Sequence, residues 1–336
     1  MSDSLPEAST TVYRERQTAA VLSLVIGFVL LLFKFWAFNL THSEAVFSDA
    51  MESIVNVFAA FFLVNIIRLS AAPPDQNHPY GHGKFEFFAS AFEGGMITFA
   101  GLAIIYVSVD SLSKGHPLNH LSAGLAIVAG CAVVNLLLGL LLIRIGRRNH
   151  SLALQADGAH LITDFVTSAG VFLGLGLVHV TGWVWLDPVI AIVFAGVLLL
   201  TGYQILRRSA AGLTDEEDRS LITSLQKLTK ELRFEGMIQI HHARIIRSGD
   251  FHHIDAHIVV PEFWNVSECH EKTDLFAADL IQKYPFNGEV AFHVDPCRRV
   301  YCAHCDLVSC PIRQNKFENY LPVDIDTLTS PEEPNL

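Results

Sequence analysis

The chain is short of charged residues and has no basic cluster. Only 17% of its 336 residues are charged, against roughly 25% in ordinary soluble domains. No run of Lys and Arg interleaved with aromatic residues occurs, which argues against nucleic-acid binding. Residues 213–336 carry most of the acids, so the net charge of −11 mainly describes that end of the chain. No small-residue cleavage site follows the first apolar run, so that run is not typical of a signal peptide.

Long apolar runs fill residues 18–209, and 51% of the whole chain is hydrophobic. A run of about 20 apolar residues is long enough to cross the hydrocarbon core of a bilayer. The sequence predicts an all-α bundle of six transmembrane helices in residues 18–209, after a cytoplasmic segment at 1–17. The predicted spans are Ala19–Phe38, Ala45–Ile67, Phe87–Val109, Leu121–Ile143, Leu152–Val178 and Leu186–Leu206.

Basic residues predict the orientation of these spans, because Lys and Arg gather on the cytoplasmic side. The loops on one side hold only Lys114. The basic residues of the other side are Arg14, Arg16, Arg68, Lys84, Arg144, Arg147, Arg148, Arg207 and Arg208. We therefore expect both termini in the cytoplasm. The compact loops and the absence of a targeting peptide favour a bacterial inner membrane.

The second and fifth spans carry ionisable groups at helical spacing. A charge at bilayer depth costs about 3 kcal/mol, so such residues are candidates for function. One face of each helix presents them: Asp49, Glu52 and Asn56 in the second span, and Asp157, His160 and Asp164 in the fifth. Together they offer one imidazole nitrogen and several oxygens, a workable ligand set for an ion such as zinc. The alternative is that they are polar packing contacts between helices.

A short loop after the second span carries another group of ligands. Asp75, His78 and His82 lie within a turn rich in Gly and Pro, whose backbone freedom lets the three side chains converge on one ion. The alternative is an exposed turn whose histidines bind nothing.

Residues 210–297 predict a mixed soluble domain. Thr214–Glu217 resembles a helix start, residues 237–247 and 251–260 alternate like strands, and residues 288–294 predict a last strand. Asn265 and Glu268 resemble a capping box before a second helix. Histidines are dense in this domain, which favours metal binding over plain surface residues.

The segment 298–336 is predicted to be a Cys-rich stretch followed by a polar tail, disordered beyond Pro311. Clustered cysteines in a reducing cytoplasm favour metal before disulfide. The spacing leaves a zinc site, an iron–sulfur cluster and unligated thiols open. The cysteines are Cys297, Cys302, Cys305 and Cys310.

Four segments carry a family resemblance. They are Glu52–Asn56, Asn77–Lys84, Ala156–Asp164 and His293–Cys297, in this order. The chain resembles the cation diffusion facilitator family over roughly residues 15–300. The resemblance implies a homodimer, a cytoplasmic αββαβ domain of ferredoxin-like shape, and metal efflux in exchange for protons by alternating access.

The resemblance also implies roles for individual residues. The transport site would be Glu52, Asn56, His160 and Asp164, with Asp49 and Asp157 nearby, and the loop site would be Asp75, His78 and His82. Lys84 would interlock with an acid after the sixth span, for which we expect Asp215. The cytoplasmic ligands would be His241, His257, His270, His293 and Asp295.

The second span departs from the family's zinc pattern. Zinc-transporting members often present two Asp, or His and Asp, where this chain has Glu52 and Asn56. His160 beside carboxylates still favours zinc or ferrous iron over magnesium or calcium, and cobalt and manganese stay open. Two other classes remain: a membrane-anchored metal sensor, for which no output domain is visible, and a proton-coupled transporter of an organic cation, which would need an aromatic-lined pocket.

Overall fold

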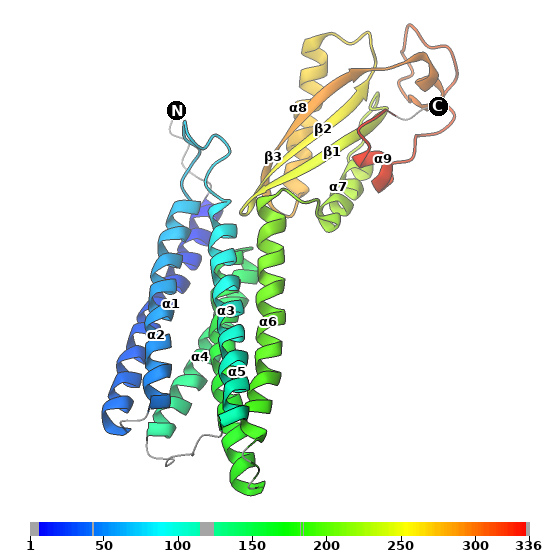
Figure 1. The fold of residues 1–336 in the computed structure, drawn as a ribbon. Coiled ribbons are helices and arrows are strands. Elements are labelled where there is room, and N and C mark those ends of the chain that lie inside the picture. Colours follow the sequence, from blue (N-terminus) through cyan, green and yellow to red (C-terminus); the bar gives the residue numbers. More distant parts are fainter. Residues whose placement is uncertain (1–6, 42–43, 115–123, 182, 184, 334–336) are drawn as a thin grey trace. The chain divides into compact units, whose positions relative to one another are not determined.

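The chain forms two compact units, Met1–Thr214 and Asp215–Leu336, in a computed structural model (Figure 1). The structure describes residues 7–41, 44–114, 124–181, 183 and 185–333. The start of the predicted fourth span, residues 121–123, lies outside these residues. Each unit has its own architecture and is taken in turn.

Six long helices make up the described part of the first unit. They are α1 (Glu7–Thr41), α2 (Glu44–Ser70), α3 (Phe85–Lys114), α4 (Gly124–Arg148), α5 (Leu152–Thr181) and α6 (Leu186–Leu213). Within the described residues, the stretches Thr11–Ala37, Phe85–Asp110 and Ala129–Arg148 are long and apolar enough to cross a membrane. Helices suit such sequences because they pair every backbone polar group internally.

Close backbone contact joins α4 to α5. A Cβ atom on Gly139 would lie 2.7 Å from the carbonyl oxygen of Gly158, and one on Gly158 would lie 2.7 Å from that of Gly139. Small residues allow this approach, which is a common way for helices in membranes to associate. The contact fixes the rotation and depth of α5, the helix that carries His160 and Asp164.

A buried ion pair ties α1 to α3. Arg16 Nη1 lies 3.0 Å from Glu86 Oε1, and both side chains are nearly closed to solvent. The Ser151 hydroxyl donates to Glu86 Oε2 at 2.7 Å, and the Arg16 guanidinium also donates to the carbonyl oxygen of Asn149. Buried charges are tolerated only with such partners, so these bonds hold three parts of the bundle together.

The second unit begins with the order α7 (Arg219–Glu231), β1 (Gln239–Ser248), β2 (Phe251–Val260), α8 (Val266–Lys283) and β3 (Asn287–Pro296). The sheet runs β1-β2-β3, antiparallel between β1 and β2 and parallel between β2 and β3. His241, His257 and His293 lie side by side in its register, one on each strand.

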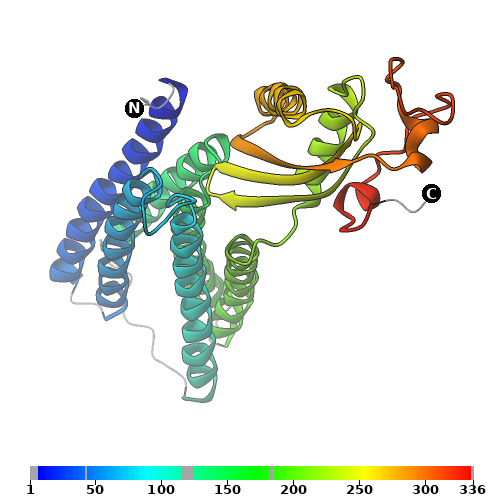
Figure 2. The ribbon, with the colours of Figure 1, turned by 90° about the horizontal axis from the view of Figure 1, so that it is seen from above.

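Both longer helices of this unit pack on one face of the sheet (Figure 2). Helix α7 begins at Arg219, after the expected start at residues 214–217, because the Asp218 side chain accepts the Ser220 amide at 3.0 Å and so caps the helix there. Asn265 caps α8, since its side chain accepts the Glu268 amide at 3.0 Å, which is one of the two bonds of the predicted capping box.

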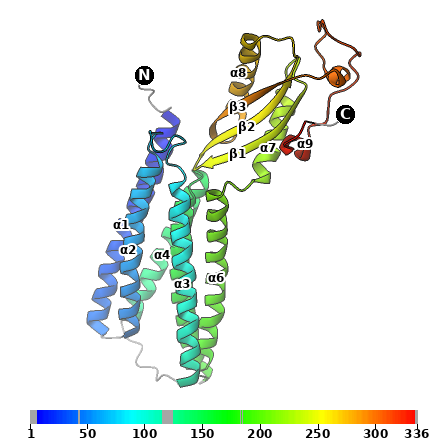
Figure 3. The same cartoon turned by 45° about the horizontal axis from the view of Figure 1, so that its top comes forward.

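The C-terminal tail is folded, so the expectation of disorder beyond Pro311 was wrong. Leu321, Val323 and Leu328 are buried in the core of the second unit. The short helix α9 (Ile325–Thr329) packs beside β1 (Figure 3), and a capping box between Asp324 and Thr327 starts it. A few well-placed apolar residues therefore anchor a tail whose composition alone indicates disorder.

The α4–α5 contact yields a stability prediction. Gly158→Val should lower the apparent Tm of the purified protein in detergent, because the added carbon atoms meet the α4 backbone and such overpacking costs about 1–3 kcal/mol. Gly130→Val is the matched control on α4, where an added Cβ meets nothing within 4 Å. Equal melting of the two variants would contradict the close contact.

Candidate metal sites

Three predicted transport residues come together between α2 and α5. His160 Nε2 lies 2.8 Å from Asn56 Oδ1 and 3.8 Å from Asp164 Oδ1. The Asn56 amide nitrogen donates to Asp164 Oδ2. His160 and Asp164 are buried. The three side chains, of which Asn56 is half-buried, gather one nitrogen and several oxygens, a donor set that suits a divalent transition ion.

Two further predicted residues lie outside the described side chains. Helix α2 carries Asp49 and Glu52, but only its backbone is described at these positions. The place of Glu52 in the transport site stays a prediction.

Glu93 on α3 adds an acid that the sequence analysis overlooked. Its Oε2 atom lies 3.7 Å from His160 Nδ1, and among the described residues neither buried atom has a hydrogen-bond partner. The signal was available, because Glu93 lies inside a predicted span and carries the same insertion cost as Asp164. The imidazole thus stands between an acid on one side and the Asn56–Asp164 pair on the other.

Asp157 lies one turn before His160 on α5 and is almost fully buried. The Ser23 hydroxyl of α1 donates to its Oδ2 atom at 2.8 Å. This contact accounts for one polar residue of the α5 stripe as a link to α1. Asp157 is not among the residues that contact His160 or Asp164 through a hydrogen bond.

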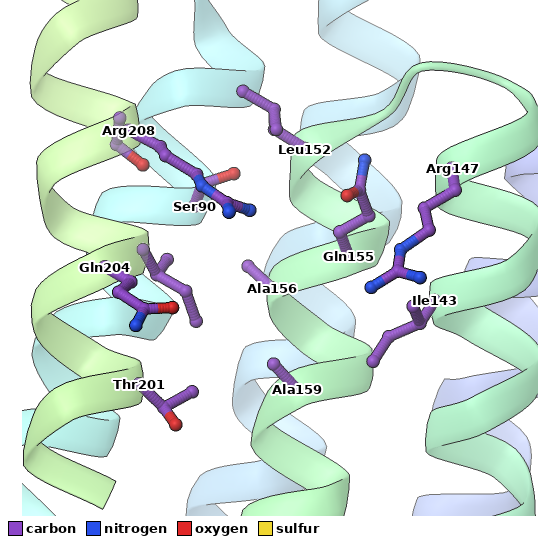
Figure 4. Close-up of a pocket in the computed structure, with 12 residues that line it drawn as sticks. Ser90, Ile143, Arg147, Leu152, Gln155, Ala156, Ala159, Thr201, Gln204 and Arg208 are labelled. Atoms are coloured by element: carbon purple, nitrogen blue, oxygen red, sulfur yellow. The ribbon is translucent and has the colours of Figure 1, made fainter.

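A separate cavity of about 130 Å³ opens between α3, α4, α5 and α6 (Figure 4). Arg147 and Arg208 reach into it from α4 and α6, Gln155 of α5 lies between them, and Gln204 lies on α6 near Arg208. None of the described residues that line it offers a carboxylate or an imidazole. Two cations and no such ligand make the cavity a poor place for a transition metal.

The predicted loop residues form a compact cluster. Asp75 Oδ1 lies 3.2 Å from His78 Nδ1, and Asp75 Oδ2 lies 3.4 Å from His82 Nε2. One ligand atom from each residue falls within 4.8 Å of the other two. Gly81 adopts a φ of +79°, which favours glycine, and so lets the chain turn back on itself.

The turn itself keeps Asp75 ionised. The His78 amide donates to Asp75 Oδ1 at 2.7 Å and the Asn77 amide donates to the same atom at 2.8 Å. These bonds, that of His78 first, hold the pKa of Asp75 below its usual value. The backbone therefore prepares a charged ligand beside two imidazoles.

A third cluster spans the sheet of the second unit. Asp295 Oδ2 lies 2.9 Å from His257 Nδ1 and 3.3 Å from His241 Nε2, and Asp295 Oδ1 lies 3.5 Å from His293 Nε2. The buried His241 has no hydrogen-bond partner on either ring nitrogen among the described residues. Burial, with His257 adding to it, lowers the pKa of His241, so its ring is held in the neutral form that binds metal.

His270 is not brought to this cluster. It lies exposed on α8, and the group whose ligand atoms meet holds His241, His257 and Asp295. His252 lies on the same strand as His257 but is buried in the core. Its Nδ1 atom lies 2.9 Å from the Tyr284 hydroxyl, and its ring stacks on that of Phe286 with 4.3 Å between the centroids.

The remaining predicted residues are Lys84, Asp215 and four cysteines. Lys84 belongs to the first unit and Asp215 to the second, so their interlock stays a prediction. Cys297, Cys302, Cys305 and Cys310 are free thiols that line one small cavity in the second unit.

The contrast between His252 and His257 gives a test by substitution. His252→Ala should lower the apparent Tm of the full chain, because it breaks a buried hydrogen bond worth about 1–3 kcal/mol when one partner is left unsatisfied, and should keep the zinc content. His257→Ala should do the reverse. Thermal melting and metal analysis of both variants decide the matter, and a loss of zinc from His252→Ala alone would contradict these roles.

Comparison with known proteins covers both units. The model of the cation efflux transmembrane domain matches residues 20–214, and that of the cytoplasmic domain of cation efflux proteins matches residues 220–297. "Uncharacterized transporter sll1263" of Synechocystis is 34% identical over 279 residues, which cover 82% of this chain and 89% of that protein. The cation-efflux pump FieF of Salmonella newport is 25% identical over 281 residues, covering 83% and 92%.

The first of these matches alone covers more than half of the chain, 20–214 of 336 residues. The long apolar helices of the chain and its matches to known proteins agree. The chain is an integral membrane protein that belongs to the cation diffusion facilitator family of cation efflux transporters.

Proposed function

We propose that this protein exports a divalent transition metal from the cytoplasm in exchange for protons. The observation that carries the proposal is the buried meeting of Asn56, His160 and Asp164 between α2 and α5. Glu52, one turn before Asn56 on α2, completes the site as a further carboxylate ligand. With Glu52 and Asp164 ionised and His160 neutral, the site carries two negative charges, which balance one divalent cation.

The direction of the hydrogen bonds supports exchange with protons. An ionised Asp164 only accepts, so the Asn56 amide has to present its nitrogen to Asp164 and its oxygen to His160. That oxygen also only accepts, so His160 Nε2 carries a proton in the metal-free site. A metal ion can bind Nε2 only after this proton leaves.

Glu93 supports the same exchange from the other side of the ring. An acid 3.7 Å from Nδ1 favours a proton on that nitrogen. An arriving metal ion displaces the proton from Nε2, while the neighbouring acid favours a proton on Nδ1. The proton left on Nδ1 keeps the Nε2 lone pair aimed at the ion, as second-shell acids do at many metal sites. Glu93 is thus a positioning residue.

The remaining clusters fit supporting roles. We assign Asp75, His78 and His82 to a metal site in the loop, and His241, His257, His293 and Asp295 to a site in a ferredoxin-like cytoplasmic domain that joins two protomers. We infer that the chain crosses a bacterial inner membrane six times, so that both termini lie in the cytoplasm. The family match and the element order of the second unit support this arrangement.

The donor set favours zinc or ferrous iron as the cargo. An imidazole nitrogen beside carboxylates suits these ions better than magnesium or calcium, which prefer oxygen alone. Asn56 supplies a neutral oxygen where a second acid would bind zinc more tightly, so cobalt and manganese stay within the range of the site.

Transport by purified protein in liposomes tests the proposal. Asp164→Asn should lower the zinc flux at least tenfold, because it removes a charged ligand and leaves the helix shape unchanged. Asp110→Asn changes an acid of α3 that lies outside the cluster and should leave the flux near that of the wild type. The flux is read with a zinc-sensitive dye inside the vesicles, with and without an imposed pH gradient.

The same vesicles separate the rival functions. A metal sensor would bind zinc without any flux, and an organic-cation transporter would move its cargo with zinc absent. Full activity of Asp164→Asn, or a flux that ignores the pH gradient, would overturn metal–proton exchange at this site.

Glu93→Gln provides a separate prediction. Glutamine keeps the volume of the side chain but no longer favours a proton on His160 Nδ1. We expect zinc affinity to fall about 10–100-fold, the usual effect of losing a second-shell partner, and the flux to depend less on pH. A variant that changes expression or Tm but keeps the wild-type pH profile would show that Glu93 only packs the helices.

A further inference from the structure

The four cysteines of the C-terminal segment line one cavity. Cys297 follows β3, Cys302 belongs to the short helix η1 (Arg299–His304), Cys305 ends it, and Cys310 follows in the next loop. All four line a space of about 10 Å³, close to that of one water-sized sphere. Cys302 and Cys305 are buried, and the other two are half-buried. The space is large enough for one ion and too small for an iron–sulfur cube.

The backbone around these thiols is held in place. Arg313 donates to the carbonyl oxygens of Cys302 at 3.2 Å, Cys305 at 2.8 Å and Leu307 at 2.6 Å. The Gln314 amide donates to Cys302 Sγ at 3.4 Å. An amide that donates to a sulfur stabilises negative charge on it, so the loop is prepared for a thiolate.

Positive charge also faces the cavity. Arg299 and Arg313 both line it. One terminal nitrogen of Arg299 pairs with Glu262 at 2.5 Å, while the other, Nη1, is buried and lacks a hydrogen-bond partner among the described residues. Four thiolates around a divalent ion carry two net negative charges, and a buried guanidinium nitrogen beside them would offset part of that charge.

We propose that Cys297, Cys302, Cys305 and Cys310 form a tetrathiolate site for a single zinc ion that fastens the C-terminal segment to the soluble unit. Zinc prefers four tetrahedral ligands with Zn–S distances of about 2.3 Å. In the described structure no three of the sulfurs lie within 4.8 Å of one another, so the ion draws them inward and closes the cavity. Four S–H bonds give way to four Zn–S bonds, and four protons pass to solvent.

Other uses of these thiols fit less well. Cys302 and Cys305 are buried, whereas the reactive thiols of redox enzymes lie in partly exposed places. The match to the cytoplasmic cation efflux domain ends at residue 297. The site is therefore an addition to that domain, separate from the transport site.

The fastened segment has a clear partner within the unit. The Glu318 amide donates to the Ala303 carbonyl at 2.8 Å, and the His304 ring lies 2.9 Å from the Asn319 carbonyl. Both bonds link η1 to the start of the tail whose apolar residues enter the core. A zinc ion bound by the four cysteines would hold η1 in place, and η1 in turn is hydrogen-bonded to the start of the tail.

Cobalt(II) loading of the full chain in detergent tests the proposal. In addition to the visible bands of a tetrahedral ion, thiolate ligands give cobalt intense sulfur-to-metal absorption bands in the near ultraviolet, which His and carboxylate sites lack. We expect these bands in the wild type, their displacement by zinc, and their loss in the double variant Cys302→Ser/Cys305→Ser, with one ion fewer per chain. Cys269→Ser, a free thiol of the same unit outside the cavity, is the matched control and should keep the bands.

Mass analysis of thiol labelling covers the case in which the double variant fails to fold. In the wild type, zinc should protect four thiols from alkylation, and a chelator should expose them. Wild-type protein without the sulfur bands, bands that persist in the double variant, bound iron and sulfide, or a mass that shows disulfides after reducing purification would each overturn the single-zinc site.

Discussion

The ion pair between Arg16 and Glu86 is the contact on which the first unit depends. A charge buried among apolar helices must meet an opposite charge and further donors, or the unit would lose several kcal/mol. The Ser151 hydroxyl and the Asn149 carbonyl add hydrogen bonds to the pair, so separating α1, α3 and the turn before α5 would leave a buried charge without its partner. Asp157 is a second buried acid that needs a partner, and the Ser23 hydroxyl supplies it. This hydrogen bond links α1 to α5 one turn before His160, which faces Asn56.

Within this frame of tied helices, the hydrogen bonds of the metal cluster are incomplete. His160 Nδ1 and Glu93 Oε2 face each other at a distance too long for a hydrogen bond, and the Asn56 amide bridges two groups that could both bind an ion. Each of these side chains therefore faces more than one polar neighbour, and a bound ion would compete with those neighbours for the same atoms.

Local pattern was enough to predict much of this molecule. The apolar runs located all six long helices of the described residues, and helical spacing singled out Asn56, His160 and Asp164 before any contact was known. Glu93 was missed because only the second and fifth spans were searched for polar stripes, although Glu86, Ser90 and Glu93 lie at i, i+4 and i+7 along α3. The tail was misjudged because composition averages over residues, whereas Leu321 and Leu328 act one at a time. His270 also shows the limit, since the family resemblance placed it among ligands that the sheet brings together without it.

The row of His241, His257 and Asp295 has a mechanical consequence. These side chains come from β1, β2 and β3 in turn, so an ion among them would act as a cross-tie over the whole width of the sheet. Strands joined only by backbone bonds open independently at their edges, whereas tied strands open together. When a metal ion binds, the exchange of the β1 and β3 amide hydrogens with solvent would then slow by the same factor. The rigidity of the sheet would therefore depend on the concentration of metal around it.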